Sequence, residues 1–154
     1  MTVLVWDGHT LATDRQANDG SAKWEADKAW YITDPVDNKI AIVSGVGILE
    51  DILKMREWYK QGATQEAFPE LHGKSQLIVV RKESGLWVFE SVPHPVHYGF
   101  NPHAFGHGKD FAYGALAMGA SAKEAVDASN MFCLHTGKGI GQYTLLGGHD
   151  GTEV

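Results

Sequence analysis

The sequence of 154 residues contains a single cysteine, Cys133, and therefore cannot form a disulfide bond within the chain. A reducing cytoplasm is the location we expect for such a chain. The sequence also lacks any apolar run near the ~20 residues needed to span a bilayer. Its first residues lack the basic start and long apolar core of a signal peptide. We therefore expect a cytoplasmic protein without a membrane partner.

Positive charge is also scarce. Thirteen Lys and Arg residues stand against 19 Asp and Glu residues, which gives a net charge of −6. A surface that binds nucleic acid needs a basic face to neutralise phosphates, so we expect no nucleic-acid partner. The chain has no internal repeat and no low-complexity linker. It predicts one domain over residues 2–146, followed by a polar tail over residues 147–154.

What the sequence does contain is an ordered series of strand and helix patterns. Asp7-Gly8 predicts a hairpin between the first two strands, and Ser121 with Glu124 predicts a capping box that opens a helix. Strands are expected at residues 2–6, 9–15, 23–33, 39–43, 76–81, 86–90, 104–106 and 142–146, with a further short strand within 92–102. Helices are expected at residues 48–59, 63–71, 110–119 and 121–134. This order predicts an α+β fold of two stacked sheets, each covered on its outside by helices.

Four stretches of this chain together resemble one known family. They are Met1-Thr2-Val3-Leu4-Val5 followed by Ala12-Thr13-Asp14, Gly45-Val46-Gly47, Ala104-Phe105-Gly106-His107-Gly108, and Asn130 to Thr136. In this order they resemble the bacterial HslV peptidase and proteasome β-subunits, over roughly residues 2–146. The resemblance implies a four-layer αββα sandwich of the N-terminal-nucleophile (Ntn) hydrolase type.

The resemblance also implies that Thr2 becomes the reactive first residue once Met1 is removed. A threonine hydroxyl is a poor nucleophile unless a base takes its proton. A terminal threonine carries that base itself, because the reference pKa of a free α-amine is about 7.7–8.0. The alternative is that Thr2 is only a β-branched residue that starts a strand.

Asp14 and Lys28 are the expected partners of Thr2. A three-residue hairpin loop would pair Thr2 with Asp14, whereas a two-residue loop would pair it with Thr13. By resemblance, a strand lysine lies near the nucleophile, and Lys28 fits better than Lys23 because an apolar strand follows it. Its charge would favour a neutral amine. The alternative for Asp14 and Lys28 is a surface ion pair of little energetic value.

Gly45, Gly47 and His107 are the expected substrate-binding residues. Glycines before a helix N-terminus allow backbone N–H groups to approach an oxyanion closely, although an ordinary strand-to-helix turn has the same pattern. The sequence departs from the family at His107, which stands where a serine usually assists the amine. It also shows no clear counterpart, near Asn130 to Cys133, of the supporting aspartate of many β-subunits.

Three further groups of residues suggest a bound metal or a second nucleophile. Main-chain carbonyls of Asn130, Cys133 and Thr136 match a stretch that binds sodium in HslV-like peptidases, and a water-capped helix end is the alternative. No organic cofactor is expected. A zinc site at His94, His97, His103 and His107 matches no standard ligand spacing. Cys133 with His135 suggests a thiol nucleophile, but a buried helix cysteine explains the same residues.

The resulting hypothesis is a threonine endopeptidase subunit of a homo-oligomeric ring that encloses its sites and cleaves peptides or unfolded proteins. The resemblance also implies an ATP-dependent unfoldase as partner. Two alternatives remain open. One is a catalytically silent homologue that acts in assembly or binding, and the other is an amide hydrolase of the same superfamily that is not a peptidase.

Overall fold

The computed structural model describes residues 2–18 and 22–145, so the polar tail over residues 147–154 lies outside the described residues. The chain divides into two compact units. The first is built from the chain up to residue 28 together with residues 100–144, and the second is built mainly from residues 29–99. The prediction of a single domain over residues 2–146 stays a prediction. Within the described residues, no helix has the length and apolar character needed to cross a membrane.

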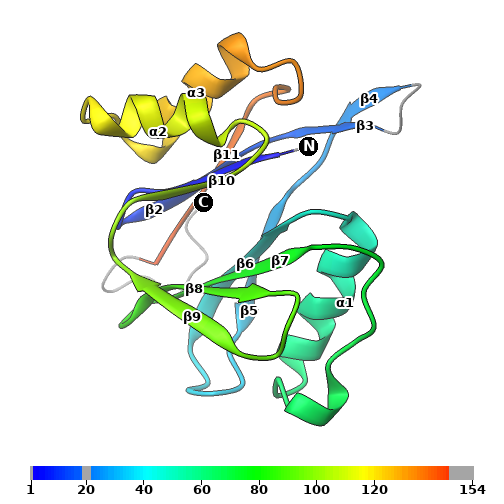
Figure 1. Ribbon diagram of the computed structural model, residues 1–154. Helices are drawn as coiled ribbons and strands as arrows, with labels where there is room; N and C mark the ends of the chain where they lie inside the picture. Colours follow the sequence, from blue (N-terminus) through cyan, green and yellow to red (C-terminus); the bar gives the residue numbers. More distant parts are fainter. Residues whose placement is uncertain (1, 19–21, 146–154) are drawn as a thin grey trace. The chain divides into compact units, whose positions relative to one another are not determined.

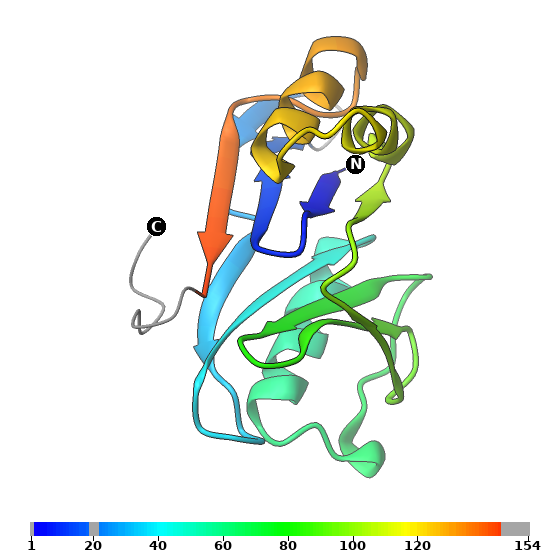
Figure 2. The ribbon, with the colours of Figure 1, turned by 90° about the vertical axis from the view of Figure 1, so that its left-hand side faces the viewer.

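The first unit is a four-stranded sheet covered on one face by two helices (Figures 1 and 2). The strand order is β10-β1-β2-β11, with β10 (His103–Gly106), β1 (Val3–Trp6), β2 (Thr10–Asp14) and β11 (Ile140–Thr144). Helices α2 (Lys109–Ala117) and α3 (Ala122–Phe132) cover the sheet. Their contact with it is an apolar layer of small side chains, including Val3, Val5, Ala12, Ala112 and Val126. Small residues at these positions allow the helices to pack closely on the sheet.

The helix α3 begins as the sequence predicts. The Ser121 side chain accepts a hydrogen bond from Glu124 N–H, and the Glu124 carboxylate accepts one from Ser121 N–H. Two N–H groups that have no partner within the helix are thus satisfied. Ala122 N–H, in the first turn, donates to the Asp7 carboxylate of the β1–β2 turn, so this turn and the start of α3 are fixed together.

The register of the first hairpin differs from both predicted registers. Leu4 pairs with Thr13 and Trp6 with Leu11, so neither Asp14 nor Thr13 lies opposite Thr2. The cause is a longer turn, in which one oxygen of the Asp7 carboxylate accepts hydrogen bonds from the N–H groups of His9 and Thr10. Asp side chains stabilise turns in this way. The longer turn places Asp14 beyond the end of the β1 ladder, beside the first residues of the chain.

The second unit is a five-stranded antiparallel sheet with one helix packed against it (Figure 1). The strand order is β5 (Ala29–Thr33), β6 (Ile40–Val46), β7 (Gln76–Arg81), β8 (Gly85–Glu90) and β9 (Pro95–Gly99). Helix α1 (Leu49–Lys60) follows β6 and buries Met55, Trp58 and Tyr59 among Val43, Leu77, Val79 and Phe89 of the sheet. The predicted hairpin over residues 76–90 is confirmed.

The structure corrects two predicted elements and adds one that was not predicted. The expected strand over residues 23–33 is two strands, β4 (Lys23–Glu25) and β5, because the chain passes from the first unit to the second at residues 28 and 29. β4 pairs with β3 (Gln16–Asn18), a short strand without an apolar pattern that the sequence analysis missed. The helix expected over residues 63–71 is a single 3₁₀ turn, η1 (Gln65–Ala67), because Pro69 follows it closely.

Candidate active site

Asp14 is the centre of a hydrogen-bonded cluster at the end of β2. Its carboxylate is fully buried and accepts four hydrogen bonds. One oxygen accepts from Val3 N–H at 3.2 Å and from Lys28 Nζ at 2.9 Å. The other accepts from the N–H groups of Gln16 and Gly137, each at 3.3 Å. A buried carboxylate requires this degree of pairing because its desolvation is otherwise very costly.

Lys28 joins this carboxylate to the predicted nucleophile. Its Nζ atom lies 3.3 Å from Thr2 Oγ1, and only 13% of the side chain is exposed. Burial lowers the pKa of Lys28, and the charge and hydrogen bond of Asp14 oppose this shift without cancelling it. This is not a surface ion pair. Lys23, the other candidate, lies exposed on β4.

The backbone of Thr2 is held by two glycines on either side of His107. Gly108 N–H donates to the Thr2 carbonyl oxygen at 3.4 Å. Gly106 has a φ of +94°, and a Cβ atom at this residue would lie 2.1 Å from the same oxygen. A side chain at Gly106 would thus displace Thr2. Glycine is therefore required at this position by its contact with Thr2 as well as by its positive φ.

His107 lies between Gly106 and Gly108, which both lie against the Thr2 carbonyl oxygen. Its ring is exposed and lies 5.2 Å from the ring of His135, centroid to centroid. Partial desolvation lowers the pKa of His107, and the proximity of His135 adds to this shift. A neutral imidazole can accept a proton as well as donate one. The sequence analysis did not expect His135 beside His107.

Ser129 is a further residue of this region that no sequence pattern marks. It is fully buried on α3, and its hydroxyl lies 3.1 Å from the hydroxyl of Thr136. A Cβ atom at Gly108 would lie 1.9 Å from Ser129 Oγ, so the two residues are in direct contact. A single serine inside an amphipathic helix gives no signal of its own, and only the fold shows which residue it faces.

Gly45 and Gly47 lie in the second unit, where β6 ends and α1 follows. A Cβ atom at Gly45 would lie 2.7 Å from the Gln76 carbonyl oxygen. Gly47 has a φ of +120°, and its Cβ would lie 2.6 Å from Ser75 Oγ. Both glycines are thus required locally by packing, and their role toward a substrate stays a prediction.

The residues proposed for a cation lie where α3 ends. The helix ends at Phe132, and Cys133 takes extended backbone angles (φ −90°, ψ 127°). Asn130 Oδ1 is buried and has no hydrogen-bond partner among the described residues, while Asn130 Nδ2 donates to the Gly139 carbonyl oxygen. The last carbonyls of a helix lack partners within the helix, and carbonyl oxygens are ligands that hard cations accept, so a cation held by the main chain of Asn130, Cys133 and Thr136 stays a prediction.

The other suggested metal site is not assembled. His97 stacks on Trp87 in the second unit, whereas His103 and His107 belong to the first. Over residues 2–18 and 22–145, no group of three or more His, Cys, Asp or Glu side chains has metal-binding geometry.

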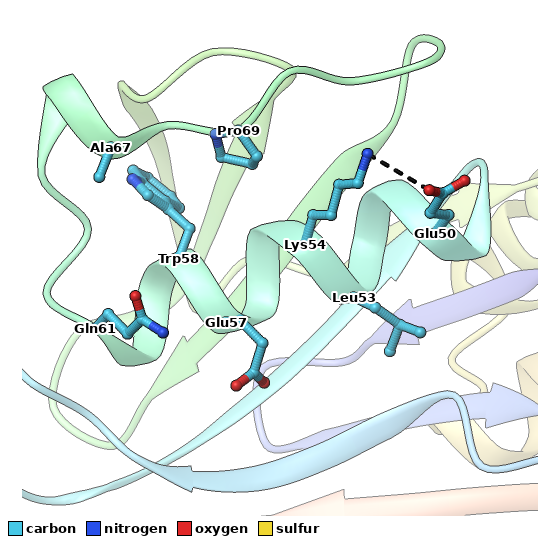
Figure 3. A pocket seen from close by; sticks show the side chains of 8 residues that line it. All are labelled: Glu50, Leu53, Lys54, Glu57, Trp58, Gln61, Ala67 and Pro69. Carbon is cyan, nitrogen blue, oxygen red and sulfur yellow. Dashed lines mark ion pairs between the residues drawn. The ribbon is translucent and has the colours of Figure 1, made fainter.

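The second unit contains an open pocket of about 480 Å³ along α1 (Figure 3). Trp58 and Pro69 lie on one side of the helix, and an ion pair of 3.5 Å joins Lys54 to Glu50 near its start. This lining has no nucleophile beside a base, so we place the candidate active site at Thr2.

These elements define a known fold. A helix pair on a four-stranded antiparallel sheet, and a helix on a five-stranded sheet, are the parts of the proteasome-type Ntn-hydrolase fold, and Thr2 directly precedes β1. The comparison with solved structures supports this assignment. No protein-family model matches the sequence, and no curated protein matches it.

Three solved structures are similar to this chain. BPH of Thiobacillus denitrificans, solved in complex with epoxomicin, is 15% identical with a TM-score of 0.65, over 94% of this chain and 98% of that one. A Gly-1 mutant of Anbu from Hyphomicrobium sp. strain MC1 is 12% identical with a TM-score of 0.74, over 94% and 82%. HslV from Trypanosoma brucei is 18% identical with a TM-score of 0.61, over 92% and 97%. All three are proteasome-type Ntn hydrolase relatives, so the predicted resemblance is confirmed at the level of the fold.

Proposed function

We propose that this protein is a threonine-type endopeptidase in which Thr2, exposed by removal of Met1, is the nucleophile. One observation carries the proposal: Lys28 Nζ lies 3.3 Å from Thr2 Oγ1 and 2.9 Å from the buried Asp14 carboxylate. Burial of a lysine charge is costly, and this lysine contacts the Thr2 hydroxyl in addition to the carboxylate that it pairs with. Perturbed groups of this kind are typical of catalytic sites.

The proposed reaction begins when the α-amine of Thr2 takes the proton of Oγ1. Oγ1 then attacks the carbonyl carbon of the peptide bond, and the proton passes to the departing amine nitrogen. The C–N bond breaks and leaves an ester on Thr2. A water molecule gives one proton to the same amine and attacks this ester, which releases the acid and restores the hydroxyl. Because one residue supplies both nucleophile and base, positioning costs little entropy.

The other residues have supporting roles in this proposal. The charge of Lys28, fixed by Asp14, favours the neutral amine and stabilises the ionised hydroxyl. N–H groups of Gly45 and Gly47 stabilise the oxyanion of the tetrahedral intermediate. His107 contacts the bound peptide and, as an imidazole, exchanges protons with the amine in place of the usual serine.

We further propose that copies of the chain form a closed homo-oligomeric ring in the cytoplasm. The likeness to HslV supports this proposal. Enclosure would restrict access to peptides and unfolded proteins, and an ATP-dependent unfoldase would deliver them.

We also propose a sodium ion at the end of α3, held by main-chain carbonyls of Asn130, Cys133 and Thr136. It would order the loop after α3 and take no part in the chemistry. We expect thermal stability to rise with sodium but not with an equal concentration of choline, which cannot enter a carbonyl cage. Equal melting temperatures in the two salts would contradict this site.

A catalytically silent homologue is the second candidate function. The observation that favours it is the exposed His107 at the position where the family has a serine. Such a protein would assemble like its relatives but leave peptides uncleaved.

The mature N-terminus and the Thr2→Ala variant separate the two candidates. We expect intact mass spectrometry to show loss of Met1, and Thr2→Ala to abolish cleavage of a fluorogenic peptide panel. Thr33→Ala, at an exposed threonine of β5, is the matched control and should keep full activity. Epoxomicin, which the Thiobacillus protein binds, should add its mass to the wild-type chain and not to Thr2→Ala. Retention of Met1 on all chains, or full activity of Thr2→Ala, would rule out the peptidase.

A further inference from the structure

A buried pair of hydroxyl groups lies beneath the candidate site. Ser129 on α3 and Thr136 in the loop after α3 approach to 3.1 Å, and both residues are buried. Neither hydroxyl has a place in the reaction proposed above. The residues that the hydroxyl pair contacts on each side indicate its function.

On one side, the pair supports the residue that holds Thr2. Ser129 Oγ fills the space that a side chain at Gly108 would occupy. Gly108 N–H in turn donates to the Thr2 carbonyl oxygen at 3.4 Å. The position of Ser129 thus determines how closely Gly108 approaches the main chain of Thr2.

On the other side, the pair leads to the carboxylate that holds Lys28. Gly137, which follows Thr136 directly, donates its N–H to Asp14 at 3.3 Å. Its carbonyl oxygen accepts a hydrogen bond from Arg15 N–H at 3.0 Å. The backbone next to Thr136 is therefore fixed to Asp14, the last residue of β2, and to Arg15, which follows it.

These contacts form a closed circuit. It runs from Thr2 to Gly108 by a hydrogen bond, to Ser129 by a packing contact, to Thr136 through the hydroxyl pair and along the chain to Gly137. It returns through Asp14 and Lys28 to Thr2 Oγ1. The hydroxyl pair is the link between the half that holds the main chain of Thr2 and the half that holds Lys28. Buried networks of this kind fix one arrangement when every member is paired.

We propose that Ser129 is a positioning residue, which through Thr136 keeps the Asp14–Lys28 pair at its distance from Thr2. This inference rests on the proposed function of Thr2. Loss of either hydroxyl would leave the other buried and unpaired. The two halves of the circuit would then separate slightly, and Lys28 would lie farther from the α-amine and Oγ1 of Thr2. Misplacement of a catalytic group by about 1 Å can cost on the order of 100-fold in rate.

The test is a double-mutant cycle of Ser129→Ala and Thr136→Val. Each variant removes one hydroxyl from the pair, and Thr136→Val keeps the volume of the side chain. We expect each single variant to lower kcat about tenfold or more with KM nearly unchanged, and the double variant to lose no more than either single one. Thr136→Ser keeps the hydroxyl and should retain most of the activity. Val126→Ala is the matched control, because it removes buried volume from the same helix without touching the circuit.

A second readout is independent of peptide cleavage. The pH dependence of acylation of the N-terminal amine, followed by mass spectrometry, reports how strongly Lys28 favours the neutral amine. The titratable groups around Thr2 include Lys28 beside its hydroxyl, Asp14 beside Lys28, and His107 between the two glycines that contact its carbonyl oxygen. When Lys28 moves away, the midpoint of acylation should rise by about half a pH unit or more. Val126→Ala should leave it unchanged.

The two readouts separate this inference from the proposed function. If the wild-type protein cleaves no peptide but the acylation midpoint shifts in Ser129→Ala and Thr136→Val, the peptidase proposal fails and the positioning role stands. If both variants match Val126→Ala in midpoint and in kcat, Ser129 has a structural role only and the inference is overturned. Should Ser129→Ala fail to fold, the kcat and acylation midpoint of Thr136→Val are compared with those of Thr136→Ser. Equal values in these two variants would overturn the inference.

Discussion

Gly106 and Gly119 have nearly the same φ angle but different surroundings. Their φ values are +94° and +90°. A Cβ atom at Gly119 would meet nothing within 4 Å, whereas one at Gly106 would lie 2.1 Å from the Thr2 carbonyl oxygen. This pair of residues therefore separates the cost of a left-handed backbone from the cost of displacing Thr2.

We expect Gly119→Ala to lower the free energy of unfolding by about 1–2 kcal/mol, the cost of a left-handed residue with a side chain. Gly106→Ala should cost about 1–3 kcal/mol more, because a collision with backbone atoms is added. It should also abolish catalysis, whereas Gly119→Ala should not. Denaturant unfolding and a peptide assay measure both effects. Equal losses in the two variants would show that Gly106 does not hold Thr2.

Lys28 is tested by a change that keeps its charge. Lys28→Arg retains an ion pair with Asp14, but a planar guanidinium differs from an ammonium group in shape and hydrogen-bond directions. We expect a folded protein whose kcat falls about 100-fold, because the catalytic group is misplaced. Circular dichroism checks the fold. The same substitution at an exposed lysine of α1, Lys60→Arg, is the control and should behave as wild type. Unchanged kcat in Lys28→Arg would show that the shape of the ammonium group is not needed.

At the scale of elements, helix α1 is fixed to the segment before β7 by one carboxylate. Asp51 is fully buried and accepts hydrogen bonds from the N–H groups of His72 and Gly73 and from the Ser75 hydroxyl. Burial by itself would raise the pKa of Asp51, but these hydrogen bonds outweigh it and hold the pKa below its usual value. Ser75 Oγ also accepts from Ile48 N–H at 3.1 Å, so the network reaches the turn that contains Gly47.

The lowered pKa of Asp51 gives a pH-dependent prediction. A carboxyl group with a lowered folded-state pKa binds fewer protons when folded, so it stabilises the fold above its unfolded pKa of about 3.9. This contribution is lost as the pH falls through the folded-state pKa. We therefore expect Asp51→Asn to unfold more easily than wild type at pH 7, with a smaller difference at pH 3. A difference that stays constant between these pH values would contradict the role of the charge.

At the scale of the whole molecule, the outer side of α2 and α3 exposes several large apolar residues. Among the described residues they include Phe111, Met118, Met131, Phe132 and Leu134. The rings of Phe111 and Phe132 stack at 6.1 Å, so the two helices share this apolar surface. Contiguous apolar surface of this kind is typical of protein interfaces.

If the protein forms a ring, this surface is a candidate contact between copies. Light scattering coupled to size exclusion should give a mass several times 16.8 kDa at micromolar concentration. Phe132→Asp should shift the protein toward smaller species, because a charge is costly in an apolar interface. Val36→Asp, at an exposed valine of the second unit, should leave the mass unchanged. A wild-type mass equal to one chain would contradict ring assembly.

Most of the elements, and the residues of the candidate site, are predictable from the sequence and the family resemblance. Period-two patterns predicted β7 and β8, and the Ser121–Glu124 pair predicted the start of α3, because these signals are local. Thr2, Asp14 and Lys28 were named from the resemblance and the apolar strand after Lys28. The structure brings these three side chains together.

How those residues come into contact depends on the tertiary structure. The hairpin register depends on the Asp7 carboxylate and its contact with α3, which lies 115 residues away in sequence. The packing of α3 on the sheet brings Ser129 to Gly108, His135 to His107 and Gly137 to Asp14. No local pattern marks these contacts. A periodic pattern records which side of an element is buried, but the partner across that buried side is chosen by the fold as a whole.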